Sequence, residues 1–545
     1  MAMDSGAGGL LAPPQFRWNR LLMIAAASAA AVAFCQFNPW FDNAIRNLST
    51  TIALLLTAAG VWIWLLASAG VSRGIKRVLV WTVIGGAALL LLTAKAEYTG
   101  NLHIKYVPRQ WVLRVFRKAG IDVGDVIHVA RLADPPLVLT PSPTDAPQFL
   151  GPRGDAIYAE PSGKLARDWS KTPPRELWRV KVGKGWSSFA VVGDYAFTQE
   201  ETTDDLNELV TCYSLTDGKI QWAHGDPGCY DSSLGGKGPR ATPTFFEGKL
   251  LSVGGLGLLN CLDAATGKKL WSRNPAQESA ATIPDWGVSS SPLVYNSAKH
   301  GPIVVVSAGG TQGNSLHAYG LLDGKPVWSV GNDPPGYCSP QLRTIGGVHQ
   351  VVLVNWQAVT GHDPETGAEL WRYEDAMWNG INPKVPQPIV LDDKRVLISA
   401  GYGTGCVMLE VTRGSDGKWS VASKWKTNKL KPKFTNLVVR DNHAYGLDDG
   451  AFLMCLDLAD GDLKWRSSRN ADYGHGQVLL VDDLLVVLSE TGDLAVVPAE
   501  PTKYQELTRT TLLPVGTTWN VPVLIGRKIL VRNDLEAALY ELPVE

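Results

Sequence analysis

The side chains in this sequence with the clearest capacity for binding are aromatic or cationic, and most open a short apolar segment. The eight are Trp186, Arg240, Trp286, Tyr337, Lys433, Phe434, His475 and Trp519. Aromatic faces beside positive charges suit a planar anion, a sugar or a peptide. We therefore predict that these eight residues bind a ligand or a partner. We assign no catalytic residue and no metal ligand.

A structural role would account for the same residues. The aromatic rings could fill a tapering channel, and Arg240 could pair with Asp231 or Asp285. His475 stands between two glycines and could equally be a hydrogen-bonded structural histidine. In the binding interpretation, Trp286 and Trp519 should be partly exposed.

Motifs for covalent or redox chemistry are absent from the sequence. It contains no Cys-x-x-Cys pair, His-Glu-x-x-His helix or Gly-x-Ser-x-Gly elbow. Cys212, Cys261 and Cys455 hold the same place in three repeats, just before a turn, as small core residues do. Cys229 and Cys338 fall in loops of different repeats and could form a disulfide only if those loops meet.

A repeated turn followed by Trp indicates what positions these residues. A short polar turn, usually with Gly, precedes six of the seven copies, which are Trp178 (without the turn), Trp222, Trp271, Trp328, Trp371, Trp425 and Trp465. Successive copies are 44, 49, 57, 43, 54 and 40 residues apart, which is the range of one propeller blade. Gly supplies the positive φ of a tight hairpin, and Trp offers a large apolar surface to the gap between blades. We interpret these Trp as packing residues.

Eight apolar strand openings set the number of blades. They begin near Trp186, Arg240, Trp286, Tyr337, Lys384, Phe434, His475 and Trp519. The eighth unit ends with the chain and lacks its outer strand, whereas Leu177-Trp178 precedes the first unit. We therefore predict an all-β fold, an eight-bladed β-propeller with a velcro closure, in which this early strand completes the last blade. The openings converge on the central channel, and we call the eight binding candidates the channel mouth.

The repeats resemble a known family. The turn-and-Trp copies, the Ser-Ser-Pro strand openings and the segment Phe149-Leu150-Gly151-Pro152-Arg153-Gly154 look like those of pyrroloquinoline-quinone (PQQ) repeat propellers, over roughly residues 146–545. That family includes quinoprotein alcohol dehydrogenases and the outer-membrane assembly lipoprotein BamB. For the dehydrogenases, the resemblance implies PQQ, a calcium ion held by carboxylate and amide side chains, two adjacent cysteines over the quinone and an Asp base. This sequence has no Cys-Cys dipeptide and no segment that stands out as the calcium and base constellation.

Two functional hypotheses follow from the resemblance. We favour a binding or assembly platform of the cell envelope, similar in role to BamB, with an envelope protein or polymer as its partner and no cofactor. The alternative is a membrane-bound, PQQ-dependent dehydrogenase of an alcohol or a polymer, with PQQ and calcium. The missing cysteine pair weighs against an enzyme without deciding the question. Because the net charge is −1 and no basic field stands out, we expect no nucleic-acid partner.

The N-terminal part is typical of a membrane anchor. After a tail of residues 1–20, uncharged segments long enough to cross a hydrocarbon core of roughly 30 Å lie at about 21–41, 51–71 and 78–94. We predict three transmembrane helices within residues 21–94. The first segment could instead be a cleaved signal peptide, since Arg17 and Arg20 precede it.

Charged residues in the short loop at 72–77 predict the orientation. Arg73, Lys76 and Arg77 favour the cytoplasmic side for this loop and hence for the N-terminus. We therefore expect a protein of the bacterial inner (cytoplasmic) membrane, with its propeller on the extracytoplasmic side.

Residues 95–145 form the predicted linker to the propeller, which we place at residues 146–545. Residues 106–118 mix cationic and apolar side chains that a helix starting at Pro108 could separate onto two faces. Such a helix could lie on the membrane surface or be a solvated spacer.

Overall fold

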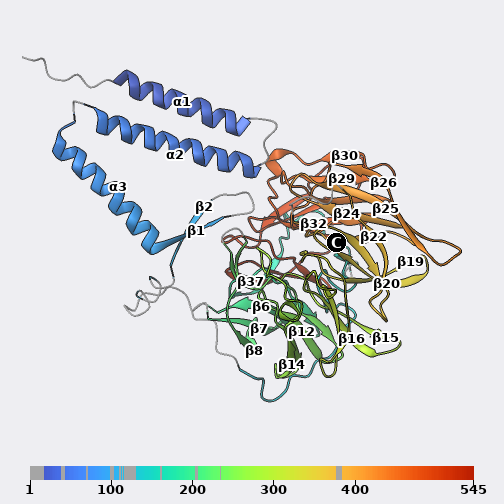
Figure 1. The fold of residues 1–545 in the computed structure, drawn as a ribbon. Coiled ribbons are helices and arrows are strands. Elements are labelled where there is room, and N and C mark those ends of the chain that lie inside the picture. Colours follow the sequence, from blue (N-terminus) through green and yellow to red (C-terminus); the bar gives the residue numbers. More distant parts are fainter. Residues whose placement is uncertain are drawn as a thin grey trace, which may run out of the picture. The chain divides into compact units, whose positions relative to one another are not determined.

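The computed structural model describes residues 18–37, 43–68, 71–98, 104–109, 112, 115, 131–159, 163–202, 206–232, 235–375 and 383–545. The chain divides into two compact units, Met1–Val123 and Gly124–Glu545. The first is mainly helical and the second is built of strands (Figure 1).

The first unit contains three long apolar helices, α1 (Trp18–Phe37), α2 (Asn43–Ala67) and α3 (Arg73–Thr93). Stretches of 18, 23 and 21 residues within them are long and apolar enough to cross a membrane, so the prediction of three membrane-spanning helices is confirmed. Helix α3 begins at Arg73, five residues before the predicted start, because the Ser72 hydroxyl caps it by accepting a hydrogen bond from the Ile75 amide.

Polar side chains join the first two helices. The Thr57 hydroxyl donates to the Ser28 hydroxyl over 2.8 Å, and the Gln36 amide donates to the Thr50 hydroxyl over 2.9 Å. Such pairs associate helices in an apolar surrounding, where no water competes for the hydrogen bonds.

A hairpin that the sequence analysis missed follows α3 directly. Strands β1 (Ala94–Tyr98) and β2 (Ile104–Pro108) pair antiparallel, with Ala94 opposite Pro108. Residues 106–108 are therefore strand, so the predicted helix does not begin at Pro108. The β-branched and aromatic residues Ile104, Tyr106 and Val107 suit a strand. Most of residues 110–118 lie outside the described residues.

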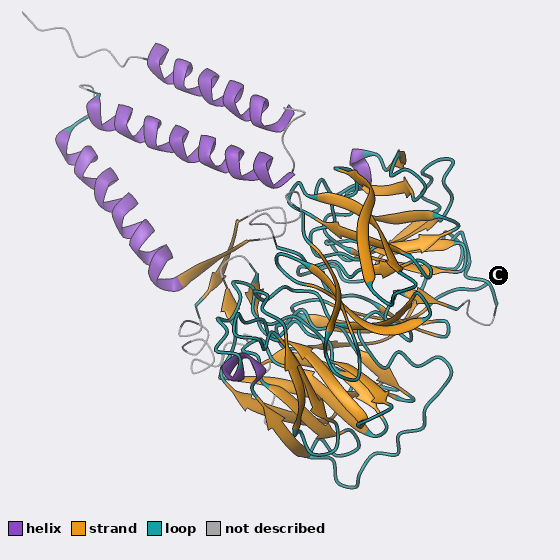
Figure 2. Ribbon diagram, turned by 45° about the vertical axis from the view of Figure 1, so that its right-hand side comes forward, coloured by secondary structure: helices purple, strands orange, loops and turns teal. Residues whose placement is uncertain are grey.

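The second unit is an eight-bladed propeller, as predicted, with each blade a four-stranded antiparallel meander (Figures 1 and 2). Blades 1 to 4 consist of β5 (Ala190–Val192), β6 (Tyr195–Glu201), β7 (Asn207–Ser214) and β8 (Ile220–Pro227); β11 (Thr244–Phe246), β12 (Lys249–Val253), β13 (Leu259–Asp263) and β14 (Lys269–Arg273); β15 (Leu293–Ser297), β16 (Gly301–Ser307), β17 (Leu316–Gly320) and β18 (Pro326–Val330); and β19 (Gln341–Ile345), β20 (Val348–Val354), β21 (Val359–His362) and β22 (Glu369–Tyr373).

Blades 5 to 8 follow in the same order. They consist of β23 (Ile389–Val390), β24 (Arg395–Ala400), β25 (Gly405–Arg413) and β26 (Trp419–Thr427); β27 (Val438–Arg440), β28 (His443–Leu447), β29 (Leu453–Asp457) and β30 (Leu463–Arg466); β31 (Gln477–Val481), β32 (Leu484–Leu488), β33 (Asp493–Pro498) and β34 (Thr508–Thr511); and β35 (Val523–Ile525), β36 (Lys528–Arg532), β37 (Glu536–Glu541) and β4 (Arg175–Lys181). Short elements between or beside the blades are β3 (Ile157–Tyr158), the hairpin of β9 (Asp231–Ser232) and β10 (Gly236–Lys237), helix α5 (Pro275–Glu278) and the 3-10 turn η1 (Arg469–Ala471).

The Trp residue of one blade packs against the turn glycine of the next blade. At five turns, the Trp ring of the preceding blade lies against the glycine, where an added Cβ would come within 2.6–2.8 Å of the ring. The pairs are Gly218 with Trp178, Gly267 with Trp222, Gly324 with Trp271, Gly367 with Trp328 and Gly461 with Trp425. All five glycines have positive φ, between 67° and 80°. The packing interpretation is confirmed for these Trp, and it explains why turn and Trp recur together.

Two of the seven Trp pack in other ways. The Trp371 indole donates to Gln350 of its own blade over 2.6 Å. In the next blade, strands β25 and β26 are nine residues long, so the turn between them lies beyond the reach of Trp371. The Trp465 indole of blade 6 donates to the Glu500 carbonyl over 2.7 Å. Glu500 lies between β33 and β34 of blade 7, and this connection contains no glycine.

The predicted velcro closure is present in the last blade. Strand β4 pairs antiparallel with β37, with Trp178 opposite Leu539. Arg179 of β4 links the same two strands by donating to Glu536 of β37 over 2.6 Å. The closure thus buries an edge that would otherwise be free to pair with another chain.

Candidate functional site

The meander brings the first residue of every inner strand to one end of the central channel. Each inner strand runs away from that end, the second strand returns and the turn to the third strand arrives at the same end. The channel mouth is therefore built from inner-strand openings and from the turns between second and third strands.

Four of the predicted residues form one aromatic row at the mouth. The ring centroids of Trp186 and Trp519 lie 4.5 Å apart, and those of Trp519 and Phe434 lie 4.9 Å apart. His475 meets Phe434 edge to face at 5.3 Å. These residues come from blades 1, 6, 7 and 8, so the row exists only in the closed ring.

A second aromatic row begins at Trp286. Its ring centroid lies 5.3 Å from that of Tyr337 and 5.8 Å from that of Tyr402. Tyr337 in turn lies 6.2 Å from Trp356. Two lysine ammonium groups lie over this row, Lys433 at 5.3 Å from the Tyr402 ring and Lys384 at 6.0 Å from the Trp356 ring.

Gly235 joins the two rows. The Trp186 indole donates to the Gly235 carbonyl over 2.7 Å, and a Cβ on Gly235 would lie 3.1 Å from the Trp286 ring. A second link is made by two residues adjacent in the chain. Phe434 is part of the first row, and Lys433 lies over the Tyr402 ring of the second row. Aromatic and cationic side chains therefore surround the mouth.

Burial divides the eight predicted residues into two sets. Trp186, Arg240, Trp286, Phe434 and Trp519 are half-buried. Tyr337, Lys433 and His475 are buried, with exposed fractions of 5%, 4% and 1%. The expected partial exposure of Trp286 and Trp519 is confirmed. His475 lies beneath the surface of the mouth, as expected for a structural histidine.

Arg240 makes neither of the ion pairs considered from the sequence. Its guanidinium donates to the carbonyls of Gly238, Gly235 and Gly236 over 2.5, 2.7 and 2.9 Å, and it lies 4.6 Å from the centre of the Tyr230 ring. No described carboxylate pairs with it. Arg240 thus holds the β9–β10 hairpin at the mouth, and burial lowers its pKa to about 10.

Sequence reasoning missed several residues of the mouth. Trp356 and Tyr402 lie in turns between second and third strands, and Lys384 opens an inner strand. The return of every second strand to the mouth is a signal that could have identified the two turn residues. Lys384 is fully buried, and burial lowers the pKa of its ammonium group to about 8.

Just below the mouth, side chains of the inner strands form a polar belt from blade to blade. Thr242 accepts a hydrogen bond from the Ser188 amide, Ser291 from the Thr242 amide and Ser339 from the Ser291 amide, over 3.1, 2.9 and 2.8 Å. Gln387 and Asn436 continue the pattern over 3.2 and 3.0 Å. The Ser-Ser-Pro openings thus supply acceptors that join neighbouring blades around the axis.

The cysteines have no part in the mouth. Cys212, Cys261 and Cys455 are fully buried, which confirms their role as small core residues. Cys229 and Cys338 do not form the disulfide considered from the sequence.

The mouth fits an organic anion better than it fits a calcium ion. Aromatic faces beside Arg240, Lys433 and Lys384 suit a planar carboxylate such as PQQ. Calcium needs several oxygen ligands at one place, and no group of three or more His, Cys, Asp or Glu side chains within the described part of the chain could hold a metal ion.

Comparisons with known proteins support the repeat assignment. Residues 206–467 match the sequence family described as "Outer membrane protein assembly factor BamB", named PQQ_2. The chain is 26% identical over 274 residues to the dehydrogenase subunit of alcohol dehydrogenase (quinone) from Komagataeibacter europaeus. This match covers 47% of the chain and 32% of the relative, so the chain spans about a third of the length of the curated relatives it matches.

Solved structures agree on the fold. A europium-containing methanol dehydrogenase has a TM-score of 0.53 at 11% identity, over 71% of this chain and 96% of the other. Quinohemoprotein alcohol dehydrogenase from Comamonas testosteroni has a TM-score of 0.53 at 14% identity, over 73% of this chain and 80% of the other. The repeats, the eight blades and the family match together show that the propeller of this chain is similar to those of the PQQ-repeat family.

Proposed function

We propose that this protein is a membrane-anchored binding or assembly platform of the cell envelope, and that its propeller engages its partner at the channel mouth. The observation that carries the proposal is the set of half-buried aromatic side chains around the mouth, with Arg240 and Lys433 among them. Half-buried aromatic and arginine side chains gathered at one site are typical of residues that dominate binding energy.

The chemistry of the mouth favours an extended partner, such as a peptide segment or an envelope polymer. Trp186, Trp286 and Trp519 offer flat apolar surface, while lysine ammonium groups over the second row add positive charge. A peptide that carries aromatic and acidic side chains could stack on the rings and meet these charges.

The anchor supports a place at the membrane, and the loop charges support its orientation. Arg73, Lys76 and Arg77 at the start of α3 favour the cytoplasmic side for that end of the helix. In this arrangement the propeller lies on the extracytoplasmic side of the inner membrane.

A second candidate function is that of a PQQ-dependent oxidoreductase. The curated relative named alcohol dehydrogenase (quinone) favours it, since the match extends over 274 residues. The aromatic and cationic mouth would hold the planar, anionic cofactor, which would accept electrons from an alcohol. The sequence lacks the adjacent cysteine pair that the resemblance implies for the dehydrogenases, and this places the candidate second.

Photo-cross-linking at the mouth tests the platform. The photoreactive residue p-benzoylphenylalanine would replace Trp286, and as a matched control it would replace Trp419, a half-buried aromatic residue on the outer hairpin of blade 5. Irradiation of cells should yield a covalent adduct of discrete mass from the Trp286 position and none from the Trp419 position. Equal adducts from both positions, or none from the mouth, would contradict the proposal.

A cofactor assay separates the two candidates. The purified full-length protein would be incubated with PQQ and calcium and assayed for reduction of a dye by alcohols. Alcohol-dependent reduction, lost in Arg240→Gln but kept in Arg395→Gln on the outer surface, would favour the oxidoreductase over the platform.

A further inference from the structure

A segment of the propeller crosses the end of the channel opposite the mouth, and we call residues 146–158 the strap. Ala146 bridges to Val191 of blade 1, and the Phe245 amide of blade 2 donates to Pro147 over 2.8 Å. At its other end, β3 pairs parallel with β31 of blade 7. The strap therefore joins the inner strands of blades 1, 2 and 7.

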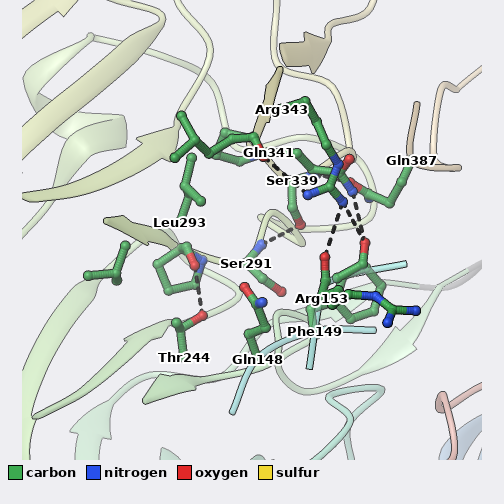
Figure 3. A pocket seen from close by; sticks show the side chains of 15 residues that line it. Gln148, Phe149, Arg153, Thr244, Ser291, Leu293, Ser339, Gln341, Arg343 and Gln387 are labelled. Atoms are coloured by element: carbon green, nitrogen blue, oxygen red, sulfur yellow. Dashed lines mark hydrogen bonds between the residues drawn. The ribbon is translucent and has the colours of Figure 1, made fainter. Parts of the chain in front are cut away.

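A pocket of about 180 Å³ lies between the strap and the polar belt (Figure 3). Gln148 and Arg153 line it from the strap, and Ser291, Ser339 and Arg343 line it from blades 3 and 4. These inner-strand residues follow the mouth openings along their strands, so the pocket is separate from the mouth. No Asp or Glu lines it.

The belt leaves hydrogen-bond donors available in this pocket. Ser291 and Ser339 each accept an amide hydrogen bond through the hydroxyl oxygen, and the Gln387 carbonyl oxygen accepts the Ser339 amide over 3.2 Å. None of the hydrogen bonds between described residues uses the two hydroxyl hydrogens or the Gln387 NH₂ group. All three groups belong to residues that line the pocket.

Arg343 brings a positive charge to the same pocket. Its guanidinium donates to the carbonyls of Gly154, Leu342 and Arg153 over 3.0, 3.2 and 3.3 Å, as Figure 3 shows for the two strap carbonyls. No carboxylate of a described residue pairs with it, whereas Arg153 pairs with Asp155 over 3.0 Å. Burial lowers the pKa of Arg343, because the charge is only partly compensated.

We propose that this pocket binds a small carboxylate, with the carboxylate group at Arg343 and its other oxygens within reach of Ser291, Ser339 and Gln387. The donors converge, the lining has no acid and the volume admits a small metabolite rather than a polymer. The Arg343 guanidinium has five N–H groups, and those not donated to the three carbonyls can form charge-assisted hydrogen bonds to a carboxylate. The site is independent of the partner proposed for the mouth.

Binding of lactate and citrate to the full-length protein in detergent tests the proposal. Titration calorimetry and thermal melts would compare each carboxylate with sodium chloride at equal ionic strength. We expect a saturable rise in melting temperature with at least one carboxylate and none with chloride. Phosphate distinguishes a general oxyanion site from a carboxylate site, and tighter binding of phosphate than of either carboxylate would overturn the assignment.

Substitutions at Arg343 locate the site. Arg343→Gln should abolish the saturable binding because it removes the charge. Arg343→Lys should weaken it by about tenfold, because lysine keeps the charge but cannot donate to the strap carbonyls and to the ligand with the same planar set of N–H groups. Arg395→Gln, at an arginine paired with Asp392 on the outer surface, is the matched control and should bind like wild type. If Arg343→Gln does not fold, the Arg343→Lys comparison decides alone. Unchanged carboxylate affinity in the Arg343 variants, or no saturable binding to wild type, would overturn the proposal.

Discussion

Replacing Trp222 by Ala tests the packing between blades at its most buried point. Trp222 lies in β8 with no exposed surface, its indole donates to the Ala264 carbonyl over 3.0 Å, and its ring lies against Gly267 of the next blade. Truncating a core Trp to Ala costs about 3–5 kcal/mol. The unpaired carbonyl adds about 1 kcal/mol, so we expect a total loss of about 4–6 kcal/mol.

Thermal melts followed by circular dichroism measure this loss. The shift in melting temperature per kcal/mol falls with chain length, and for a propeller of this size a loss of about 5 kcal/mol corresponds to roughly 5–10 °C. Gly267→Ala should lower the melting temperature as well, because its Cβ would lie 2.6 Å from the Trp222 ring and its φ is 77°.

Trp286→Ala is the matched control, since it removes a half-buried Trp of the mouth. It should cost about 1–2 kcal/mol and should weaken partner capture at the mouth. Equal destabilisation by Trp222→Ala and Trp286→Ala would refute the reasoning, because the aromatic rows would then be a structural plug of the channel.

Three further predictions concern the closure, the anchor and the buried lysine. Removing residues 530–545 deletes β37 and most of β36, so blade 8 loses the partner of β4; we expect aggregation or a large fall in melting temperature, and an unchanged melting temperature would show that the closure is dispensable. Reporter fusions that act only outside the cytoplasm should be active after residue 145 and inactive at residue 75, and the reverse pattern would contradict the orientation. Burial lowers the Lys384 pKa from 10.5 to about 8, so the folded state disfavours the charged form and wild type gains stability as the pH rises from 8 to 10.5. Lys384→Met should therefore be more stable than wild type at pH 7, with a difference in unfolding free energy that shrinks over this range; a difference independent of pH would refute the charge penalty.

The turn and Trp repeats made the blades predictable from the sequence because each blade is a local meander. Asp-Gly or Thr-Gly turns and alternating apolar residues lie within one stretch of chain, so the hairpins follow from local preferences. The closure was also predictable, because an eighth unit without an outer strand and an early strand around Trp178 complete each other. The three membrane-spanning helices follow from length and composition alone.

The mouth was predictable only in part. The strand openings gave Trp186, Trp286 and Trp519, which contact neighbours from other blades. The partners of Arg240 were not predictable, because it binds backbone carbonyls of a small hairpin and not a carboxylate that the sequence displays. Tyr402 comes from a turn whose place at the mouth depends on the return of the second strand.

The sequence by itself determined the repeat, the blade count and the anchor, since each depends on patterns within a few tens of residues. It also indicated the closure, because the incomplete eighth unit and the early strand around Trp178 complete each other. Only the tertiary structure decided which side chains face one another across the channel. The polar belt joins residues about 50 positions apart in successive blades, and the strap brings Gly154 to Arg343 over 189 positions. Such contacts depend on the angle at which one blade packs on the next. That angle is set by the packing of all the blades in the ring together, so no local sequence pattern encodes it.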